Sequence, residues 1–162
     1  MNPDKRTDKS DYYSKNLFAV KLKRAYETAP LRIQQYLNAE LAYVLDQIKP
    51  SDTVLELGCG YGRVLKRIAE KATTVVGIDI SEASLEFAKD YLRGIPNIQI
   101  HFMTARNIKL PEQTFDVVLG IQNALSATKI DPPLLLSQAL RVTKTGEKSS
   151  YPAIQKKFGR ND

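Results

Sequence analysis

Residues 54–62 read VLELGCGYG, and this stretch decides the fold of the chain. Its first part, with Thr53 before it, is apolar and β-branched enough to form a buried parallel strand. Gly58, Gly60 and Gly62 follow at every second position and turn the chain sharply towards a helix. Glycine suits this turn because a residue without a Cβ adopts positive φ readily and lets a ligand approach the backbone. The stretch therefore predicts a strand, a ligand-binding loop and a helix.

The rest of the chain alternates strands with helices. We expect strands at 53–57, 73–78, 98–103 and 115–120, and helices at about 30–49, 62–71, 82–93 and from 131 onward. Ser81 is a suitable N-cap for one of these helices and Gly94 a suitable stop. The alternation predicts an α/β fold, a Rossmann-like doubly wound and mainly parallel sheet with helices on both faces. Such sheets bind ligands at the carboxyl ends of their strands.

An acidic residue, Asp79, ends the second expected strand, about 20 residues after the first glycine of the loop. At that place a carboxylate can accept hydrogen bonds from both hydroxyls of a ribose. The glycines are spaced as G-x-G-x-G with Glu56 two positions before them, whereas the fingerprint of nicotinamide and flavin dinucleotide sites is G-x-G-x-x-G. A dinucleotide site and a non-catalytic relic of a nucleoside site remain the alternatives.

The E-x-G-x-G-x-G pattern followed by Asp79 resembles the cofactor site of class I S-adenosylmethionine-dependent methyltransferases, and the resemblance extends over about residues 51–146. It implies S-adenosylmethionine as the cofactor, with Glu56 near the amino-acid end of that molecule. It implies cofactor contacts at Glu56, Gly58, Cys59, Gly60, Gly62, Asp79, Ile80, Thr104, Ala105, Arg106 and Gln122.

One position departs from the family pattern. After the third strand, members commonly place an acidic residue before an alanine, with Leu-Pro further on, and the acidic side chain bonds the adenine amine. Here residues 102–111 read FMTARNIKLP, with Thr104 in the acidic position. A hydroxyl can accept the same hydrogen bond without the strength that a charge adds. Adenine recognition is then expected to depend also on the backbone at Ala105 and Arg106.

Gln122 and Asn123 follow the fourth expected strand and are the candidates for the acceptor side of the pocket, because the resemblance places that segment beside the sulfonium. The alternative is an ordinary strand-to-loop turn capped by an amide. No catalytic residue is identified by the sequence. Tyr12, Tyr13 and Tyr26 of the N-terminal segment are candidates to close over the ligand, with simple packing onto the domain as the alternative.

Composition agrees with one α/β domain of 162 residues. Cys59 is the only cysteine, so no internal disulfide is expected, and one Cys with one His cannot build an ordinary zinc site. No apolar run of about 18 residues predicts a membrane span. We therefore expect no metal, no membrane association and a cytoplasmic location.

The net charge of +6 is concentrated at the two ends of the chain. Residues 1–24 and 141–162 each carry +4, whereas residues 25–140 hold eleven basic and thirteen acidic side chains, a net charge of −2. The body of the chain therefore lacks the basic stripe that follows a phosphate backbone. We expect a methyltransferase that acts on a small molecule. A catalytically impaired adenosylmethionine-binding module is the second hypothesis, and a nucleic-acid methyltransferase the third.

Three regions are expected: an N-terminal polar and helical segment at 1–29, the cofactor-binding core at 30–146, and an atypical basic tail at 147–162. Family members usually continue with L-K-P-G-G and a fifth buried strand, whereas the tail here shows no apolar strand. A frameshifted reading of the codons from Gly146 can produce an aliphatic strand, so a single-base frameshift is one hypothesis and a genuine short form the other. Either way we expect a sheet without its last strands and with an open edge.

Overall fold

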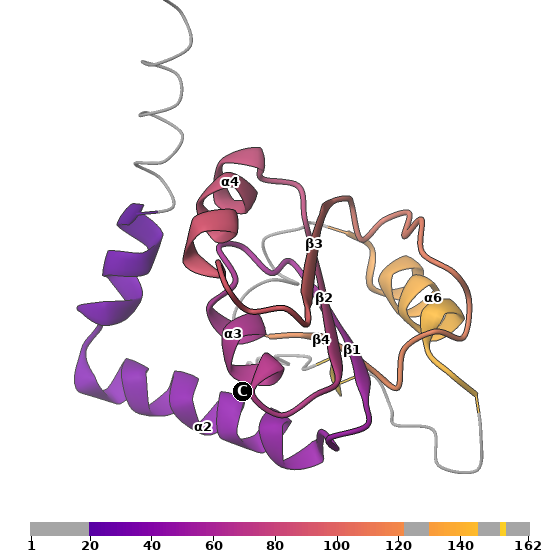
Figure 1. The fold of residues 1–162 in the computed structure, drawn as a ribbon, viewed down its shortest axis with the longest axis horizontal. Coiled ribbons are helices and arrows are strands. Elements are labelled where there is room, and N and C mark those ends of the chain that lie inside the picture. Colours follow the sequence, from indigo (N-terminus) through magenta and orange to yellow (C-terminus); the bar gives the residue numbers. More distant parts are fainter. Residues whose placement is uncertain (1–19, 122–129, 146–152, 155–162) are drawn as a thin grey trace, which may run out of the picture.

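A five-stranded sheet organises the part of the chain that the computed structural model describes, which is residues 20–121, 130–145 and 153–154 (Figure 1). Its strands are β1 (Thr53–Leu57), β2 (Thr74–Asp79), β3 (Ile98–Phe102), β4 (Val117–Gly120) and β5 (Ala153–Ile154). The spatial order is β3-β2-β1-β4-β5, and every neighbouring pair is parallel. The predicted mainly parallel Rossmann-like sheet is confirmed.

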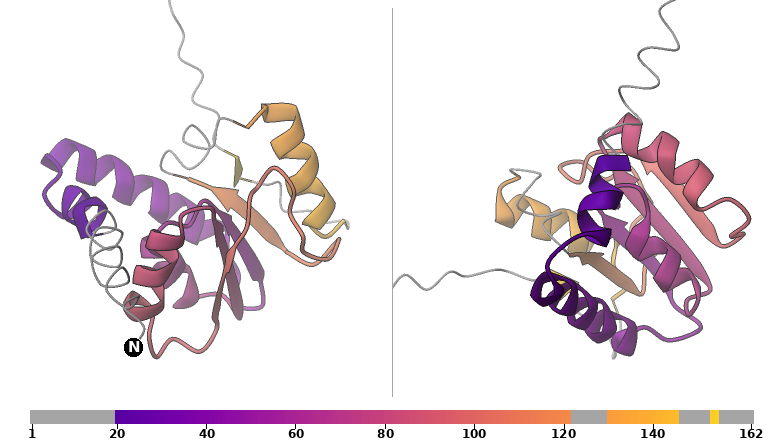
Figure 2. Two further views of the ribbon diagram at one scale, coloured as in Figure 1. Left: turned by 90° about the horizontal axis from the view of Figure 1, so that it is seen from above. Right: turned by 90° about the vertical axis from the view of Figure 1, so that its left-hand side faces the viewer.

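Helices cover both faces of this sheet. They are α2 (Leu31–Gln47), α3 (Arg63–Ala69), α4 (Glu82–Tyr91) and α6 (Pro132–Val142), and residues 20–27 are also helical. Figure 2 shows α6 on one side of the sheet and α2, α3 and α4 on the other. Ser81 caps α4 as predicted, since its hydroxyl oxygen accepts the backbone N–H of Ser84 at 3.2 Å. Gly94 has φ +85°, the conformation that a glycine stop requires.

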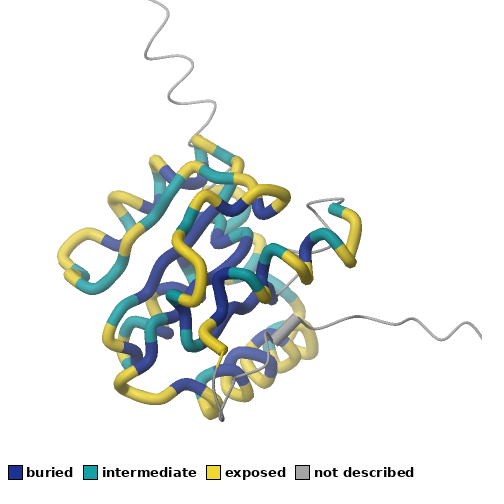
Figure 3. Tube along the Cα trace, turned by 90° about the vertical axis from the view of Figure 1, so that its right-hand side faces the viewer, coloured by how far each residue is buried: buried dark blue, intermediate teal, exposed yellow. Residues whose placement is uncertain are grey.

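Two apolar cores form because β1 is buried on both faces, as the central strand of a parallel sheet must be. Val54 packs into the core that contains residues of α2, α3 and α4. Leu55 and Leu57 pack into the second core, which contains Leu135, Ala139 and Val142 of α6. The central strands accordingly form the buried interior in Figure 3. The alternation along β1 places Glu56 on the same face as Val54.

The tail contributes to the sheet, contrary to expectation. Ala153 and Ile154 form β5 and pair with Leu119 and Gly120 of β4. The expectation that no strand follows Gly146 is therefore wrong for these two residues, and β4 is not a fully open edge. The frameshift hypothesis and the three-region division stay predictions, to be tested by sequencing the gene across the Gly146 codon and by limited proteolysis.

Gly62 and Gly94 form a matched pair for a stability prediction. Their φ angles are +87° and +85°, so alanine is similarly strained at both positions. A Cβ at Gly62 would lie 2.6 Å from Cδ1 of buried Leu92, whereas a Cβ at Gly94 would meet nothing within 4 Å in the described part of the chain. Gly62→Ala should therefore destabilise the protein more than Gly94→Ala, by about 1–3 kcal/mol of overpacking. Urea unfolding measures the difference, and equal losses would contradict the clash with Leu92.

Candidate functional site

The glycine loop between β1 and α3 has the backbone conformation that its sequence predicts. Gly58, Gly60 and Gly62 have φ angles of +73°, +55° and +87°. The N–H groups of Gly58 and Cys59 donate to the carbonyl oxygen of Ile78 at 2.8 and 3.1 Å. The loop is therefore fixed to the end of β2, and its glycines adopt angles that residues with a Cβ rarely take.

Two of these glycines serve different purposes. At Gly62 the absence of a side chain leaves room for Leu92 of the core. At Gly60 an added Cβ would meet no atom of the described residues within 4 Å, so the space beside this residue is open. Open space next to a glycine with positive φ allows a ligand to approach the backbone.

Asp79 joins the glycine loop to the turn after β2. Its Oδ2 accepts the N–H of Gly60 at 2.8 Å, and its Oδ1 accepts the N–H of Ser81 at 2.8 Å. A carboxylate offers about four acceptor positions, so both oxygens can still accept ligand hydroxyls. The sequence suggested only the role of ribose acceptor. The structure adds that Asp79 holds the loop in place.

Glu56 is a buried carboxylate whose charge lacks full compensation. Its side chain is 3% exposed, and within the described residues its Oε2 has no hydrogen-bond partner. Burial raises the pKa of Glu56 well above its ordinary value; the positive charge of Arg63 opposes this shift and the charge of Asp79 adds to it. A buried acceptor without a partner is costly, so this position is suited to a ligand that brings a cation or an N–H donor.

Cys59 lies beneath the loop. Its side chain is buried, and its Sγ would be 2.8 Å from a Cβ added at Gly77 of β2. Burial raises the pKa of the thiol, and the charges of Glu56 and Asp79 raise it further, so the group stays protonated. The small side chain fills the space below the loop, and the backbone of Cys59 holds the loop together, since its N–H donates to Ile78 and its carbonyl oxygen accepts the N–H of Gly62 at 2.9 Å.

The end of β3 lies beside Asp79, because Asp79 and Phe102 are partners in the sheet register. Two residues further on, Thr104 is exposed and its Oγ1 accepts the N–H of Arg106 at 3.2 Å. Ala105 is buried, Arg106 is exposed, and Ile80 after β2 is 61% exposed. Ile80 and Thr104 thus follow neighbouring strand ends. Gln122 and Asn123 lie outside the described residues.

A group of aromatic rings, which the sequence did not indicate as a unit, surrounds Tyr61 of the glycine loop. Its ring centroid lies 6.4 Å from that of Tyr26, 5.9 Å from Phe87 and 5.2 Å from Tyr91. Tyr61 is 3% exposed, so Tyr26 packs against a loop residue that is itself in the core. Helix 20–27 is therefore attached to the glycine loop. Burial also raises the pKa of the Tyr61 hydroxyl.

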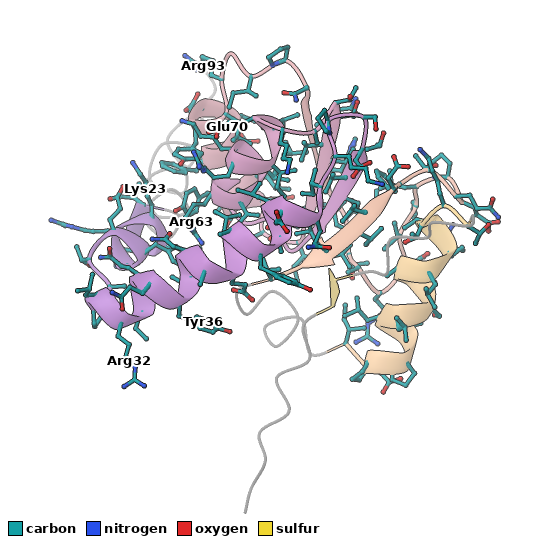
Figure 4. All side chains as sticks on the ribbon, turned by 90° about the horizontal axis from the view of Figure 1, so that it is seen from below. Lys23, Arg32, Tyr36, Arg63, Glu70 and Arg93 are labelled. Atoms are coloured by element: carbon teal, nitrogen blue, oxygen red, sulfur yellow. The ribbon has the colours of Figure 1, made fainter. Side chains whose placement is uncertain are left out.

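Cations accompany these rings. The guanidinium carbon of Arg63 lies 4.6 Å from the centroid of Tyr26, and the ammonium groups of Lys23 and Lys66 lie 5.8 and 5.0 Å from that of Tyr91. Figure 4 shows Lys23 and Arg63 on the side of the molecule where helix 20–27 lies, whereas Arg32 and Tyr36 project from the outer surface of α2. The contacts of Arg63 with Tyr26 and of Lys23 with Tyr91 strengthen the attachment of helix 20–27, whereas the contact of Lys66 with Tyr91 joins α3 to α4.

Two kinds of feature are absent from the described residues as a whole. Within them, no helix combines the length and the apolar character that a bilayer crossing requires. In the same part of the chain, no three His, Cys, Asp or Glu residues are grouped so that they could hold a metal ion.

Known proteins share this arrangement. The family model for the methyltransferase domain matches residues 54–146. "Probable ribosomal RNA small subunit methyltransferase A" of Methanosarcina acetivorans is 30% identical over 77 residues, which are 48% of this chain and 28% of that protein. Ubiquinone biosynthesis O-methyltransferase of Pseudomonas fluorescens is 31% identical over 106 residues, or 64% of this chain and 44% of that protein.

A solved structure gives the same fold. Geranyl diphosphate methyltransferase in complex with SAM superposes with a TM-score of 0.60 at 21% identity, over 67% of this chain and 45% of that chain. The chain thus spans less than half the length of the two relatives and of this structure. Because the family model matches more than half of the 162 residues, the protein belongs to the methyltransferase domain family.

Proposed function

We propose that this chain is the cofactor-binding core of an S-adenosylmethionine-dependent methyltransferase that acts on a small molecule. One observation carries the proposal: the buried carboxylate of Glu56, whose Oε2 has no hydrogen-bond partner among the described residues, belongs to the same strand–loop unit as the open space at Gly60. A ligand that fits both features brings a cation to the carboxylate and a compact group to the loop. The α-ammonium and the adjoining chain of S-adenosylmethionine have this chemistry.

The remaining contacts with the cofactor are assigned to residues of the glycine loop and to residues at the ends of the neighbouring strands. Asp79 would accept the ribose hydroxyls with the acceptor positions that Gly60 and Ser81 leave free. Exposed Ile80 would contact the adenine ring, and Thr104 with the backbone of Ala105 and Arg106 would bond its polar edge. The loop backbone at Gly58, Cys59 and Gly62 would complete the contacts, and Gln122 is assigned to the side of the pocket that faces the methyl group.

The reaction proposed is an in-line displacement. An electron pair of the acceptor forms a bond to the methyl carbon while the carbon–sulfur bond breaks, its electron pair stays on sulfur, and the acceptor loses a proton to solvent. The cofactor supplies the activated methyl group, and the protein contributes mainly the positioning of the two partners. Gln122 and Asn123 are proposed to orient the acceptor with their amides.

The net charge of the central part of the chain favours a small-molecule acceptor. Residues 25–140 carry a net charge of −2, which does not suit a nucleic-acid phosphate backbone. One similar protein is named for ribosomal RNA and another for ubiquinone biosynthesis, so nucleic-acid methylation is kept as a further candidate. A cytoplasmic location is part of the proposal, because the single buried thiol suits a reducing compartment.

Calorimetry with S-adenosylmethionine and S-adenosylhomocysteine, followed by a turnover screen with small-molecule acceptors, tests the proposal. Binding with turnover supports it. Binding without turnover on any acceptor favours an impaired adenosylmethionine-binding module instead. Absence of binding to either compound refutes the proposal. RNA binding that weakens steeply with salt would favour the nucleic-acid enzyme.

Gly60→Ala should weaken cofactor binding beyond its effect on stability. The new methyl group would occupy the open space where the ligand meets the loop. Gly94→Ala is the matched control, because its φ of +85° is also positive and its Cβ also meets nothing within 4 Å. Both variants should lose about 1–2 kcal/mol of stability to backbone strain. Only Gly60→Ala should reduce the affinity for S-adenosylhomocysteine, and unchanged affinity in calorimetry would exclude a ligand at Gly60.

Glu56→Gln should stabilise the free protein at neutral pH. Burial raises the pKa of the folded carboxyl above its ordinary 4.5, so its contribution to stability is fully present below about pH 4.5 and is lost as the pH rises through the folded pKa. The neutral amide avoids this loss. The variant should therefore gain about 1–3 kcal/mol at pH 7 in urea unfolding, and the gain should shrink towards about pH 4.

The same substitution should weaken binding of S-adenosylmethionine by about 1.5–3 kcal/mol, because the ammonium loses a charged partner. Calorimetry at pH 7 measures this second effect. A gain in stability together with a loss of affinity would indicate that the carboxylate of Glu56 serves ligand binding and not the fold. A loss of stability at pH 7 would instead show that Glu56 supports the fold, and would contradict its assignment to the cofactor.

Substitutions at Thr104 test adenine recognition. In Thr104→Asp one carboxylate oxygen can keep the bond from the N–H of Arg106 while the other accepts the adenine amine, with the added strength of a charged acceptor. Thr104→Val can do neither. The expected order of affinity for S-adenosylhomocysteine is Asp, then Thr, then Val, with steps of about 1 kcal/mol. Three equal affinities would show that this side chain does not face the base.

A further inference from the structure

Side chains of α6 hold the backbone of the loop between β3 and β4. Oε1 of Gln138 accepts the N–H of Ile108 at 3.0 Å. Nη1 of Arg141 donates to the carbonyl oxygen of Leu110 at 3.3 Å, and its Nη2 donates to that of Ile108. Both backbone polar groups of Ile108 thus have partners on α6. Since Ile108 is 1% exposed, water cannot easily replace these partners.

Apolar packing joins the same two segments. Ala105 and Ile108 of the loop belong to one core with Leu135, Ala139 and Val142 of α6. The apolar side of α6 therefore sets how close the loop lies, and its polar edge at Gln138 and Arg141 sets the orientation of the loop backbone. A hydrogen bond fixes direction in a way that apolar contact does not.

The part of this loop around Ile108 lies next in sequence to the residues that we assign to adenine recognition. Oγ1 of Thr104 accepts the N–H of Arg106, and the carbonyl oxygen of Thr104 accepts the N–H of Asn107, both at 3.2 Å. This tight turn spans Thr104 to Asn107 and ends one residue before Ile108. The orientation of the turn therefore depends on how Ile108 is held.

We propose that Gln138 and Arg141 are positioning residues for adenine recognition: through Ile108 and Leu110 they orient the turn at Thr104 so that its acceptor faces the adenine amine. The inference rests on the proposed function. It extends the site from the carboxyl ends of the strands to a helix whose two side chains act through the backbone of the loop. A purely structural role would predict a loss of stability without a change in the choice of base.

The test compares two ligands in the full chain: S-adenosylhomocysteine and its 6-deamino purine analogue, in which a hydrogen atom replaces the adenine amine. The wild-type protein should prefer the first by about tenfold, because the analogue lacks the N–H group that Thr104 accepts. Gln138→Leu removes the acceptor for the N–H of Ile108, and the preference should fall to about threefold or less. Gln138→Glu keeps an acceptor oxygen and should retain the wild-type preference.

Two controls accompany these variants. Ser137→Ala removes an exposed hydroxyl of α6 that bonds within its own helix, to the carbonyl oxygen of Leu134. Glu112→Ala removes an exposed partner of Arg141, at 3.8 Å, without touching the carbonyl contacts. Both should keep the wild-type preference. Arg141→Lys cannot reach both carbonyl oxygens as the guanidinium does, so it should reduce the preference, and it decides the matter if Gln138→Leu does not fold.

The outcomes distinguish a failure of this inference from a failure of the proposed function. Failure of the wild-type chain to bind S-adenosylhomocysteine overturns the proposed function and this inference together. Binding with an unchanged preference in folded Gln138→Leu and Arg141→Lys overturns the inference alone. Lower melting temperatures with an unchanged preference would assign Gln138 and Arg141 to stability only.

Discussion

The two hydrogen bonds that Asp79 accepts keep the site together. Its carboxylate receives one N–H from the glycine loop after β1 and another from the turn before α4, each at 2.8 Å. Neither bond depends on a ligand, so the loop is held in position before anything binds. The carbonyl oxygen of Asp79 in turn accepts the N–H of Met103, which ties β3 to the same residue. Three consecutive strand ends are thus aligned around one residue.

The sequence predicted those features of the molecule that depend on residues close together in the chain. The spacing of Gly58, Gly60 and Gly62 allows few conformations, and all three adopt the expected positive φ. Alternation of apolar residues and turn signals located β1 to β4 and the helices to within a few residues. The predicted start of β4 at residue 115 differs from Val117, because Phe115 forms an isolated bridge with Thr143 instead.

The remaining features depend on contacts between segments far apart in the chain. Tyr26 and Tyr61 meet across 35 positions, and Gln138 bonds Ile108 across 30. No residue pattern near either partner signals these contacts, since tyrosine and glutamine are common on surfaces. The bond from Gly60 to Asp79 is of the same kind: the sequence identified both residues and gave no means of seeing that they touch. Ala153 and Ile154 are too short a strand for any periodicity to indicate.

Burial of Glu56 has a thermodynamic consequence for whatever occupies the site. A carboxyl with a raised pKa holds its proton at pH values where an exposed glutamate has lost it. A cation that enters beside Glu56 favours the ionised form, so the proton is released to the buffer as the ligand binds. Ligand uptake is then coupled to proton release, and the measured heat of binding includes the ionisation enthalpy of the buffer. An oxygen on a central strand that lacks a partner in the part of the chain that the structure describes thereby makes the occupancy of the site sensitive to the acidity of its surroundings.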